Sequence, residues 1–233
     1  MRARRAASSA APTGASSRLL RIIAAIGLAV GLLQIPTPSV ALDPADRDPI
    51  AGTTGTLAGS GGYPRVIRLA HAGTADGTII ETDTDAFTGG TQRFHRSTDG
   101  GRTFEPLPSL SITGVIHGTD LFELPADAGA LSAGTLLFAA AVNPSGTYPA
   151  ESGDTEMQIP VYRSDDGAET WTLLSYSHRT DTGAGTGGLW EPELNVADDG
   201  SLVCLYSDET DHPDHSQVLT QVTSSDGGAT WSD

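Results

Sequence analysis

The sequence predicts an all-β fold assembled from repeated units, and three observations support this prediction. One octad, Ser-x-Asp-x-(Gly/Ala)-x-Thr-(Trp/Phe), occurs three times, at residues 97–104, 164–171 and 224–231. Each copy follows a short strand-like run, as the turn of a β-hairpin would. Turn residues separate the runs, and no stretch after residue 62 has a convincing helical period. A turn that recurs in this way marks a repeat architecture.

The residues of the octad suit a tight turn. Its aspartate, which is Asp99, Asp166 or Asp226, can accept hydrogen bonds from the backbone of its own turn. Its glycine can adopt positive φ, and its aromatic residue can pack beneath the turn. The pattern resembles the Asp-box, or BNR repeat, of the sialidase-like β-propellers, in which the box joins the two outer strands of a blade away from the active centre. The resemblance therefore implies structural roles for these three aspartates.

The first 41 residues have the features of an export signal. Five arginines lie within its first 21 residues, residues 22–33 form a short apolar run, and residues 39–41 are small enough for a cleavage site. The run is too short to be read first as a membrane span, although an uncleaved anchor is an alternative. The pair Arg4-Arg5 is only a weak indication of the twin-arginine route. We therefore expect residues 1–41 to be a signal peptide and the mature protein to be secreted.

Charge excludes several classes of partner. The chain has 13 Lys and Arg residues against 29 Asp and Glu residues, a formal net charge of −16. Removal of residues 1–41 takes away five arginines and no acid, which leaves 13 − 5 = 8 basic residues and a net charge of 8 − 29 = −21. We expect so acidic a protein to bind neither nucleic acid nor anionic membranes through bulk charge. Cys204 is the only cysteine, and its apolar surroundings predict a buried, unreactive thiol.

The remaining sequence divides into a lead-in and a repeat domain. Residues 42–62, rich in Asp, Gly, Thr and Pro, predict a flexible segment, and residues 63–233 predict a partial propeller of about three four-stranded blades. The expected strands are 63–70, 78–82 and 93–97, then 120–124, 135–142, 159–164 and 171–177, then 190–196, 201–207 and 217–224. Propellers close with about four to eight blades. We therefore expect a truncated propeller that needs further blades, six in all by the resemblance.

The third unit carries the most informative residues. Residues 188–194, Gly-Leu-Trp-Glu-Pro-Glu-Leu, precede residues 205–209, Leu-Tyr-Ser-Asp-Glu, and Gln217 follows before the box. This arrangement resembles glycoside hydrolase family 93, the exo-arabinanase family of the sialidase-like propellers, in which a Trp-Glu-Pro strand start is followed by a Tyr-Ser-Asp segment and a Gln. The resemblance implies that Glu191 is the catalytic nucleophile. It also implies that the partner, an acid/base Glu, lies in a later blade beyond Asp233.

A physical case for Glu191 accompanies the resemblance. Retaining glycosidases need two carboxyl groups about 5–5.5 Å apart, one as nucleophile and one as acid/base. Glu191 lies at the start of an expected inner strand, and Pro192 cannot donate to a ladder, which indicates a strand end or edge. Trp190 would supply an apolar wall for a sugar face. The alternative for Glu191 is a solvated carboxylate or one paired with an arginine.

Four further residues are candidate substrate-binding groups. Glu193 shares a strand face with Glu191, although family 93 more often has an apolar residue there. Arg65 fits the superfamily's arginine near the first inner strand, and it could bind a carboxylate or a hydroxyl; its alternative is a salt bridge. Asp120 is expected to begin the inner strand of the second unit, in the position that matches Arg65 and Glu191. Asp208 follows a strand end and could line the opening of the same substrate pocket.

We predict neither a metal nor a cofactor. His212 and His215 lie close together on a loop, but two histidines without a further clear ligand indicate zinc only weakly. The aspartate-rich turns lack the ligand spacing of a calcium-binding loop. The sequence also lacks a phosphate-loop glycine motif and a Ser-His-Asp signature.

The predicted function is a secreted glycoside hydrolase that releases terminal sugars from a polysaccharide or glycan by a retaining mechanism. Arabinan is the substrate that the resemblance implies. One alternative is an exo-α-sialidase, which needs an arginine cluster and a tyrosine nucleophile, and only Arg65 is well placed for that. Another is a non-catalytic carbohydrate-binding propeller. Because half of the site is expected elsewhere, the 233-residue chain alone is expected to be inactive.

Overall fold

The structure is a computed structural model that describes residues 62–85, 88–146, 156–181, 188–211 and 214–232. All of these residues belong to one unit, Asp48–Asp233. The predicted signal peptide, residues 1–41, lies outside the described residues, as do residues 42–61 and His212. Among the described residues, no helix has both the length and the apolar character that crossing a membrane requires.

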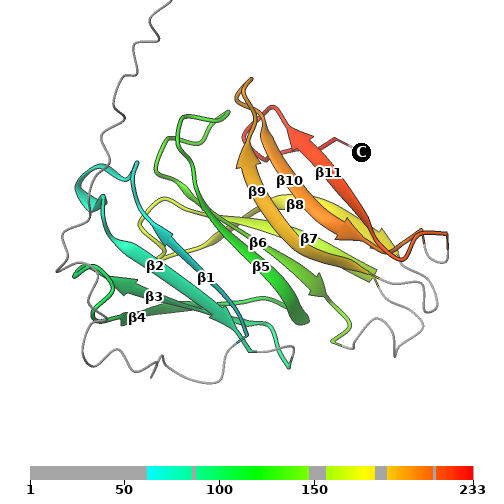
Figure 1. Ribbon diagram of the computed structural model, residues 1–233, viewed down its shortest axis with the longest axis horizontal. Coiled ribbons are helices and arrows are strands. Elements are labelled where there is room, and N and C mark those ends of the chain that lie inside the picture. The colour runs from blue at the N-terminus through cyan, green and yellow to red at the C-terminus, as the bar shows by residue number, and fades with distance from the viewer. Residues whose placement is uncertain (1–61, 86–87, 147–155, 182–187, 212–213, 233) are drawn as a thin grey trace, which may run out of the picture. The chain divides into compact units, whose positions relative to one another are not determined.

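Antiparallel strands form three sheets in the described residues (Figure 1). Sheet 1 has the order β1 (Gly62–Arg68), β2 (Ile79–Thr84), β3 (Thr91–Ser97), β4 (Glu105–Ser111), with a short 3-10 helix, η2 (Gly73–Ala75), between β1 and β2. Sheet 2 has the order β5 (Val115–Glu123), β6 (Leu136–Asn143), β7 (Glu156–Ser164), β8 (Thr172–Asp181). Sheet 3 has the order β9 (Leu189–Val196), β10 (Leu202–Asp208), β11 (Val218–Ser224). The all-β class is confirmed, whereas the blade number and the closure of a propeller stay predictions.

The three octads occupy the same place in each sheet. The third strands, β3, β7 and β11, all end at the serine that begins an octad. Strands β4 and β8 begin directly after the first and second octads, so each of these octads joins a third strand to a fourth. The expected strands are therefore found, with one clear difference. Strand β5 begins at Val115 rather than at Asp120, because His117 and Gly118 occupy an irregular part of the ladder that the sequence did not mark as strand.

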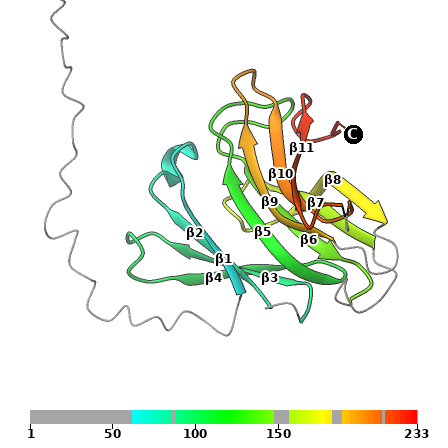
Figure 2. The same cartoon turned by 45° about the vertical axis from the view of Figure 1, so that its right-hand side comes forward.

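Sheet 2 lies between sheets 1 and 3, as Figures 1 and 2 show. Every residue of its strand β6 is buried, and successive side chains point to opposite faces. One core cluster combines Leu136, Phe138, Ala140 and Val142 of β6 with side chains of sheet 1. The other combines Leu137, Ala139 and Ala141 with sheet 3. The continuous apolar run of β6 is the sequence signature of a strand buried on both faces.

Each of the two later octads also ties its sheet to the preceding one. The aromatic ring of Trp171, in the second octad, packs against the core cluster between sheets 1 and 2. Trp231, in the third octad, packs against the cluster between sheets 2 and 3, and its indole N–H donates to Ser175 Oγ of β8 at 2.9 Å. The repeat therefore supplies contacts between sheets as well as turns within them.

Cys204 on β10 is buried within the cluster between sheets 2 and 3. Burial raises the pKa of its thiol to about 12, because a thiolate would lose its solvation there. The protonated thiol is the stable form at neutral pH, in agreement with the unreactive cysteine expected from the sequence.

Candidate active site

The innermost strands of the three sheets, β1, β5 and β9, lie side by side (Figures 1 and 2). Each has an irregularity in its ladder. In β1 and β9 two residues, Tyr63-Pro64 and Glu191-Pro192, lie opposite a single residue of the neighbouring strand. In β5 the register shifts at His117. Such bulges redirect side chains and are common next to active sites.

Tyr63 and Glu191 share an unusual backbone conformation. Both have φ of 51°, and both immediately precede a proline. Positive φ is uncommon for residues other than glycine, and a following proline further favours extended backbone. Such a conformation costs about 1–3 kcal/mol and persists only where the surrounding structure enforces it. The strain therefore marks these two positions as candidates for function.

The side chains of Tyr63 and Glu191 meet. The hydroxyl of Tyr63 donates a hydrogen bond to Oε1 of Glu191 at 3.0 Å, although 128 residues separate the two in the sequence. Strand β5 lies beneath both of them. Gly118 approaches Glu191 so closely that a Cβ atom at Gly118 would lie 3.2 Å from the Glu191 Cα, and Thr119 Oγ1 lies 3.5 Å from the carbonyl oxygen of Tyr63.

Charged groups from all three strands gather beside this pair. Arg65 Nε donates to the carbonyl oxygen of Thr119 at 2.7 Å and lies 3.9 Å from Asp120 Oδ1. The other end of its guanidinium lies 4.0 Å from Glu193 Oε2. Asp120 is buried, and its Oδ2 accepts the backbone N–H of Leu194 at 2.8 Å, which joins β5 to β9. Burial raises the pKa of Asp120 to about 6.

The structure thus brings together four of the residues that the sequence singled out, namely Arg65, Asp120, Glu191 and Glu193. Asp120 takes part from the middle of β5 rather than from its start. The residue that corresponds to Glu191 in the first sheet is Tyr63, not Arg65, because both precede the proline of a bulge. This places Arg65 in the position that corresponds to Glu193.

Trp190 and Asp208 have other surroundings. Trp190 is half-buried against the core, and its ring meets the imidazole of His117 edge to face, with centroids 5.3 Å apart. Burial lowers the pKa of His117 to about 4, so its imidazole is neutral at pH 7. Asp208, at the end of β10, accepts hydrogen bonds from the backbone N–H and the hydroxyl of Thr210 at 2.8 and 2.6 Å. The substrate-binding roles of Trp190 and Asp208 stay predictions.

Tyr63 and His117 are the residues at this site that sequence reasoning did not select. In the sequence Tyr63 is only the first residue of the expected strand 63–70. The signal that could have found it is the pair Tyr63-Pro64, which repeats the residue-proline pattern of Glu191-Pro192 at the start of another inner strand. His117 offers no comparable signal, since a histidine followed by glycine is unremarkable in a strand.

The three octad aspartates lie at the other ends of the strands and repeat one hydrogen-bond pattern. In each turn, Oδ1 of Asp99, Asp166 or Asp226 accepts from the serine hydroxyl and the threonine backbone N–H, at 2.7–3.0 Å. The threonine hydroxyl donates to Oδ2 at 2.6–2.8 Å. The pKa of each aspartate is lowered, and these hydrogen bonds are the stabilising cause. Both carboxylate oxygens of each aspartate accept hydrogen bonds from their own turn, which suits the structural role predicted for them.

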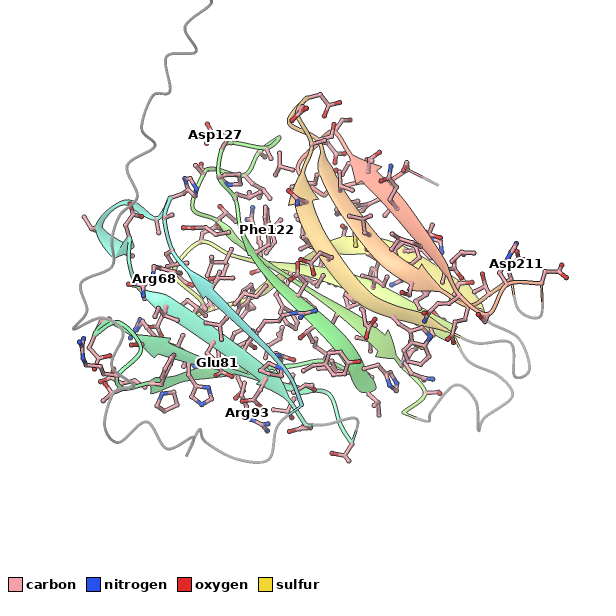
Figure 3. All side chains as sticks on the ribbon, viewed as in Figure 1. Arg68, Glu81, Arg93, Phe122, Asp127 and Asp211 are labelled. Carbon is pink, nitrogen blue, oxygen red and sulfur yellow. The ribbon has the colours of Figure 1, made fainter. Side chains whose placement is uncertain are left out.

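A second group of charged side chains lies on sheet 1. Glu81, Asp83 and His95 are buried, and their ligand-type atoms lie within 4.8 Å of one another. His95 Nδ1 is 2.7 Å from Glu81 Oε2, and Arg93 forms ion pairs with Asp83 and Asp85. Figure 3 shows Glu81 and Arg93 on this sheet. Because the guanidinium of Arg93 already supplies a positive charge beside Asp83, the arrangement is that of an ion-pair network.

Comparisons with known proteins connect the fold to one group of enzymes. No protein-family profile matches the sequence, and no curated protein matches it. Among solved structures, the α-L-arabinofuranosidase of glycoside hydrolase family 93 from Fusarium graminearum, in complex with arabinobiose, matches with 28% identity and a TM-score of 0.59. The same enzyme with an iminosugar inhibitor gives 28% and 0.60. An α-L-arabinanase from Penicillium chrysogenum with arabinobiose gives 25% and 0.60.

Each match covers 73% of this chain, but only 46–47% of the solved chain. The chain thus spans less than half of the length of the proteins that it matches. The resemblance therefore extends well beyond the residues around Trp190-Glu191-Pro192. The described part of this chain has the fold of the family 93 arabinofuranosidases and arabinanases.

Proposed function

We propose that this chain supplies the nucleophile side of the active site of a retaining glycoside hydrolase that removes terminal arabinose from arabinan. The observation that carries the proposal is the carboxylate of Glu191, held at a strained bulge and exposed beside Tyr63, Arg65 and Glu193. The structural neighbours that bind arabinobiose support the choice of sugar.

The chemistry requires two carboxyl groups. An oxygen of Glu191 attacks the anomeric carbon of the terminal sugar and forms a glycosyl ester while the glycosidic bond breaks. A second, protonated carboxyl group gives its proton to the departing oxygen; the proposal takes this acid to lie outside the described residues. Water, deprotonated by the same group, then attacks the anomeric carbon and releases both the sugar and the Glu191 carboxylate.

The charge of the site favours a neutral sugar. Glu191, Glu193 and Asp120 bring three carboxyl groups to the inner strands, and Arg65 is the arginine beside them. Arginines Arg93, Arg96 and Arg163 instead pair with acidic side chains on sheets 1 and 2. An anionic sugar such as sialic acid would meet net repulsion here, whereas arabinose would not.

The test is hydrolysis of linear arabino-oligosaccharides by this chain joined to the further blades that the proposal requires, as wild type and as two matched variants, because the chain alone is expected to be inactive. Glu191→Gln removes the proposed nucleophile, and Glu193→Gln removes the neighbouring carboxylate with the same change in charge. We expect release of arabinose by the wild type, near-complete loss in Glu191→Gln and a smaller loss in Glu193→Gln. NMR of the first product would show retained anomeric configuration.

Other results would redirect the proposal. Binding of arabinobiose without hydrolysis would indicate a carbohydrate-binding module, and hydrolysis of a sialoside would indicate a sialidase. Equal activity of wild type and Glu191→Gln would remove Glu191 from the chemistry.

We also propose that the protein is exported. The basic, apolar and small-residue segments within residues 1–41 support this, and the strongly acidic remainder suits a secreted protein. N-terminal sequencing of protein recovered from the medium of expressing cells should begin at Leu42. A chain that stays cell-associated with Met1 intact would favour the uncleaved anchor.

A further inference from the structure

We infer that Tyr63 is the positioning residue of Glu191: its hydroxyl holds Oε1 and leaves Oε2 to attack the sugar. This inference rests on the proposed function of Glu191 as a nucleophile. It adds a residue from the first sheet to a site whose reacting carboxylate comes from the third.

The geometry supports a dedicated contact. The hydroxyl of Tyr63 and Oε1 of Glu191 are 3.0 Å apart, at the long end of the range for an O–H···O hydrogen bond. Tyrosine has few rotatable bonds, so a phenol anchored at a bulge places its hydroxyl with little freedom. Glutamate has three side-chain torsions and is otherwise free to sample several rotamers in an exposed mouth. A fixed donor at one oxygen therefore restricts the direction of the other.

The backbone conformations of Tyr63 and Glu191 also support a directed contact between their side chains. Tyr63 and Glu191 each adopt φ of 51° before a proline, at matching bulges of β1 and β9. Two strained positions that face each other and join through their side chains are a more specific arrangement than either would be alone.

Strand β5 fixes the distance between the pair. Gly118 allows Glu191 to approach β5 closely, since an added Cβ would lie 3.1 Å from the Glu191 backbone nitrogen. On the other side, Thr119 contacts the carbonyl oxygen of Tyr63, and Arg65 binds the carbonyl oxygen of Thr119. Both bulges thus rest on consecutive residues of one strand. The spacing of Tyr63 and Glu191 is set by the backbone of β5 rather than by the two side chains alone.

The role has a clear chemical consequence. A carboxylate oxygen that accepts a phenol hydrogen bond is a weaker nucleophile than its partner oxygen, so the bond selects Oε2 as the attacking atom. Because the bond orients the carboxylate rather than binding the sugar, its loss should lower kcat and leave KM nearly unchanged. Loss of one hydrogen bond to a charged group, with the misalignment that follows, predicts a fall in kcat of about 10- to 100-fold.

The experiment compares wild type, Tyr63→Phe and the matched control Tyr176→Phe, each in the chain joined to the further blades that the proposed function requires. Tyr176 lies on β8, where its ring is covered by the guanidinium of Arg179, and phenylalanine preserves that ring. Two measurements are made on each protein. One is kcat and KM for linear arabino-oligosaccharides. The other is the carboxyl ¹³C resonance of Glu191 in glutamate-labelled protein, assigned by its absence in Glu191→Gln.

In Tyr63→Phe we expect a displaced Glu191 resonance and a kcat that is about 10- to 100-fold lower at similar KM. In Tyr176→Phe we expect neither change. An unmoved resonance, or an unchanged kcat in an active protein, would overturn the inference. A displaced resonance in a protein that hydrolyses no arabinoside would uphold the contact and refute the proposed function, so the two failures are distinguishable.

Discussion

The indole of Trp171 stacks on the ring of Phe94, with ring centroids 4.8 Å apart and an interplanar angle of 26°. Trp171 belongs to the octad of sheet 2, and Phe94 lies on β3 of sheet 1, so this contact fastens one sheet to the next. Phe138 of β6 completes the cluster, with its ring centroid 5.9 Å from that of Trp171.

Removal of this contact should destabilise the fold. We expect Trp171→Ala to lower the free energy of unfolding by about 3 kcal/mol, because the substitution leaves a cavity between sheets 1 and 2. Trp171→Phe keeps a ring against Phe94 and should cost about half as much. Urea unfolding followed by circular dichroism measures both. Equal, small losses in the two variants would show that the stack contributes little.

Asp226 should stabilise the protein in a pH-dependent way. Hydrogen bonds from Thr230 and then Ser224 lower its pKa from 3.8 to about 2. Because the folded pKa lies below the unfolded one, the stabilisation is present above about pH 4 and is lost as the pH falls to about 2. Asp226→Asn should therefore unfold at a lower temperature than wild type at pH 7, and the gap should narrow between pH 4 and pH 2.

The control for Asp226 is Asp76→Asn, which removes one charge from the exposed turn between β1 and β2. Thermal unfolding midpoints at a series of pH values give the comparison. If the gap between wild type and Asp226→Asn stays constant across the acidic range, the carboxylate hydrogen bonds do not stabilise the turn.

Asp120 should show the opposite dependence. Burial raises its pKa from 3.8 to about 6; the backbone N–H of Leu194 and the charge of Arg65 work against this shift, and the charge of Glu193 adds to it. The folded state therefore binds the proton more tightly than the unfolded state, and stability falls as the pH rises from about 4 to about 6. The loss should be on the order of 2–3 kcal/mol, and Asp120→Asn should abolish it. Parallel pH profiles of the free energy of unfolding in the two proteins would contradict this assignment.

Gly118 should be required for the site as well as for the fold. A methyl group at this position would lie 3.1–3.2 Å from the backbone of Glu191, so Gly118→Ala should displace Glu191 and cost about 1–3 kcal/mol of stability. Gly146→Ala is the control. Gly146 has φ of 78° but nothing within 4 Å of an added Cβ, so its substitution strains the backbone without pressing on a neighbouring atom. Only Gly118→Ala should displace the Glu191 carboxyl ¹³C resonance.

Local chemistry made much of the fold predictable. The octads placed the ends of β3, β7 and β11, and the apolar run at residues 135–142 marked the strand that the structure has as β6. The beginning of β5 was missed because Gly118 and a ladder irregularity at His117 interrupt the pattern. Arg65, Asp120 and Glu193, which the sequence offered as substrate-binding candidates, lie within 4.0 Å as ion pairs around Arg65, while their roles and that of Glu191 stay predictions.

The Tyr63–Glu191 contact was not predictable in the same way. It joins residues 128 positions apart, and it depends on two backbone conformations that neither tyrosine nor glutamate favours. Such conformations are imposed by the assembled structure and leave no trace in local propensity. The same applies to the buried, neutral state of His117, which follows from packing against Trp190.

The bulges of β1, β5 and β9 also divide each strand into a part that carries the site and a part that pairs regularly within its sheet. After each bulge the ladder resumes, as Arg65 opposite Thr82 and Glu193 opposite Leu205 show. An irregularity absorbs local change, so residues on its outer side can vary without shifting the register of the interior side. Substitutions of exposed residues near the bulges therefore leave the packing of the core unchanged. A designer could therefore exchange exposed residues around the bulges to reach new substrates, while Tyr63 and Glu191 are kept for the chemistry and the packed scaffold stays intact.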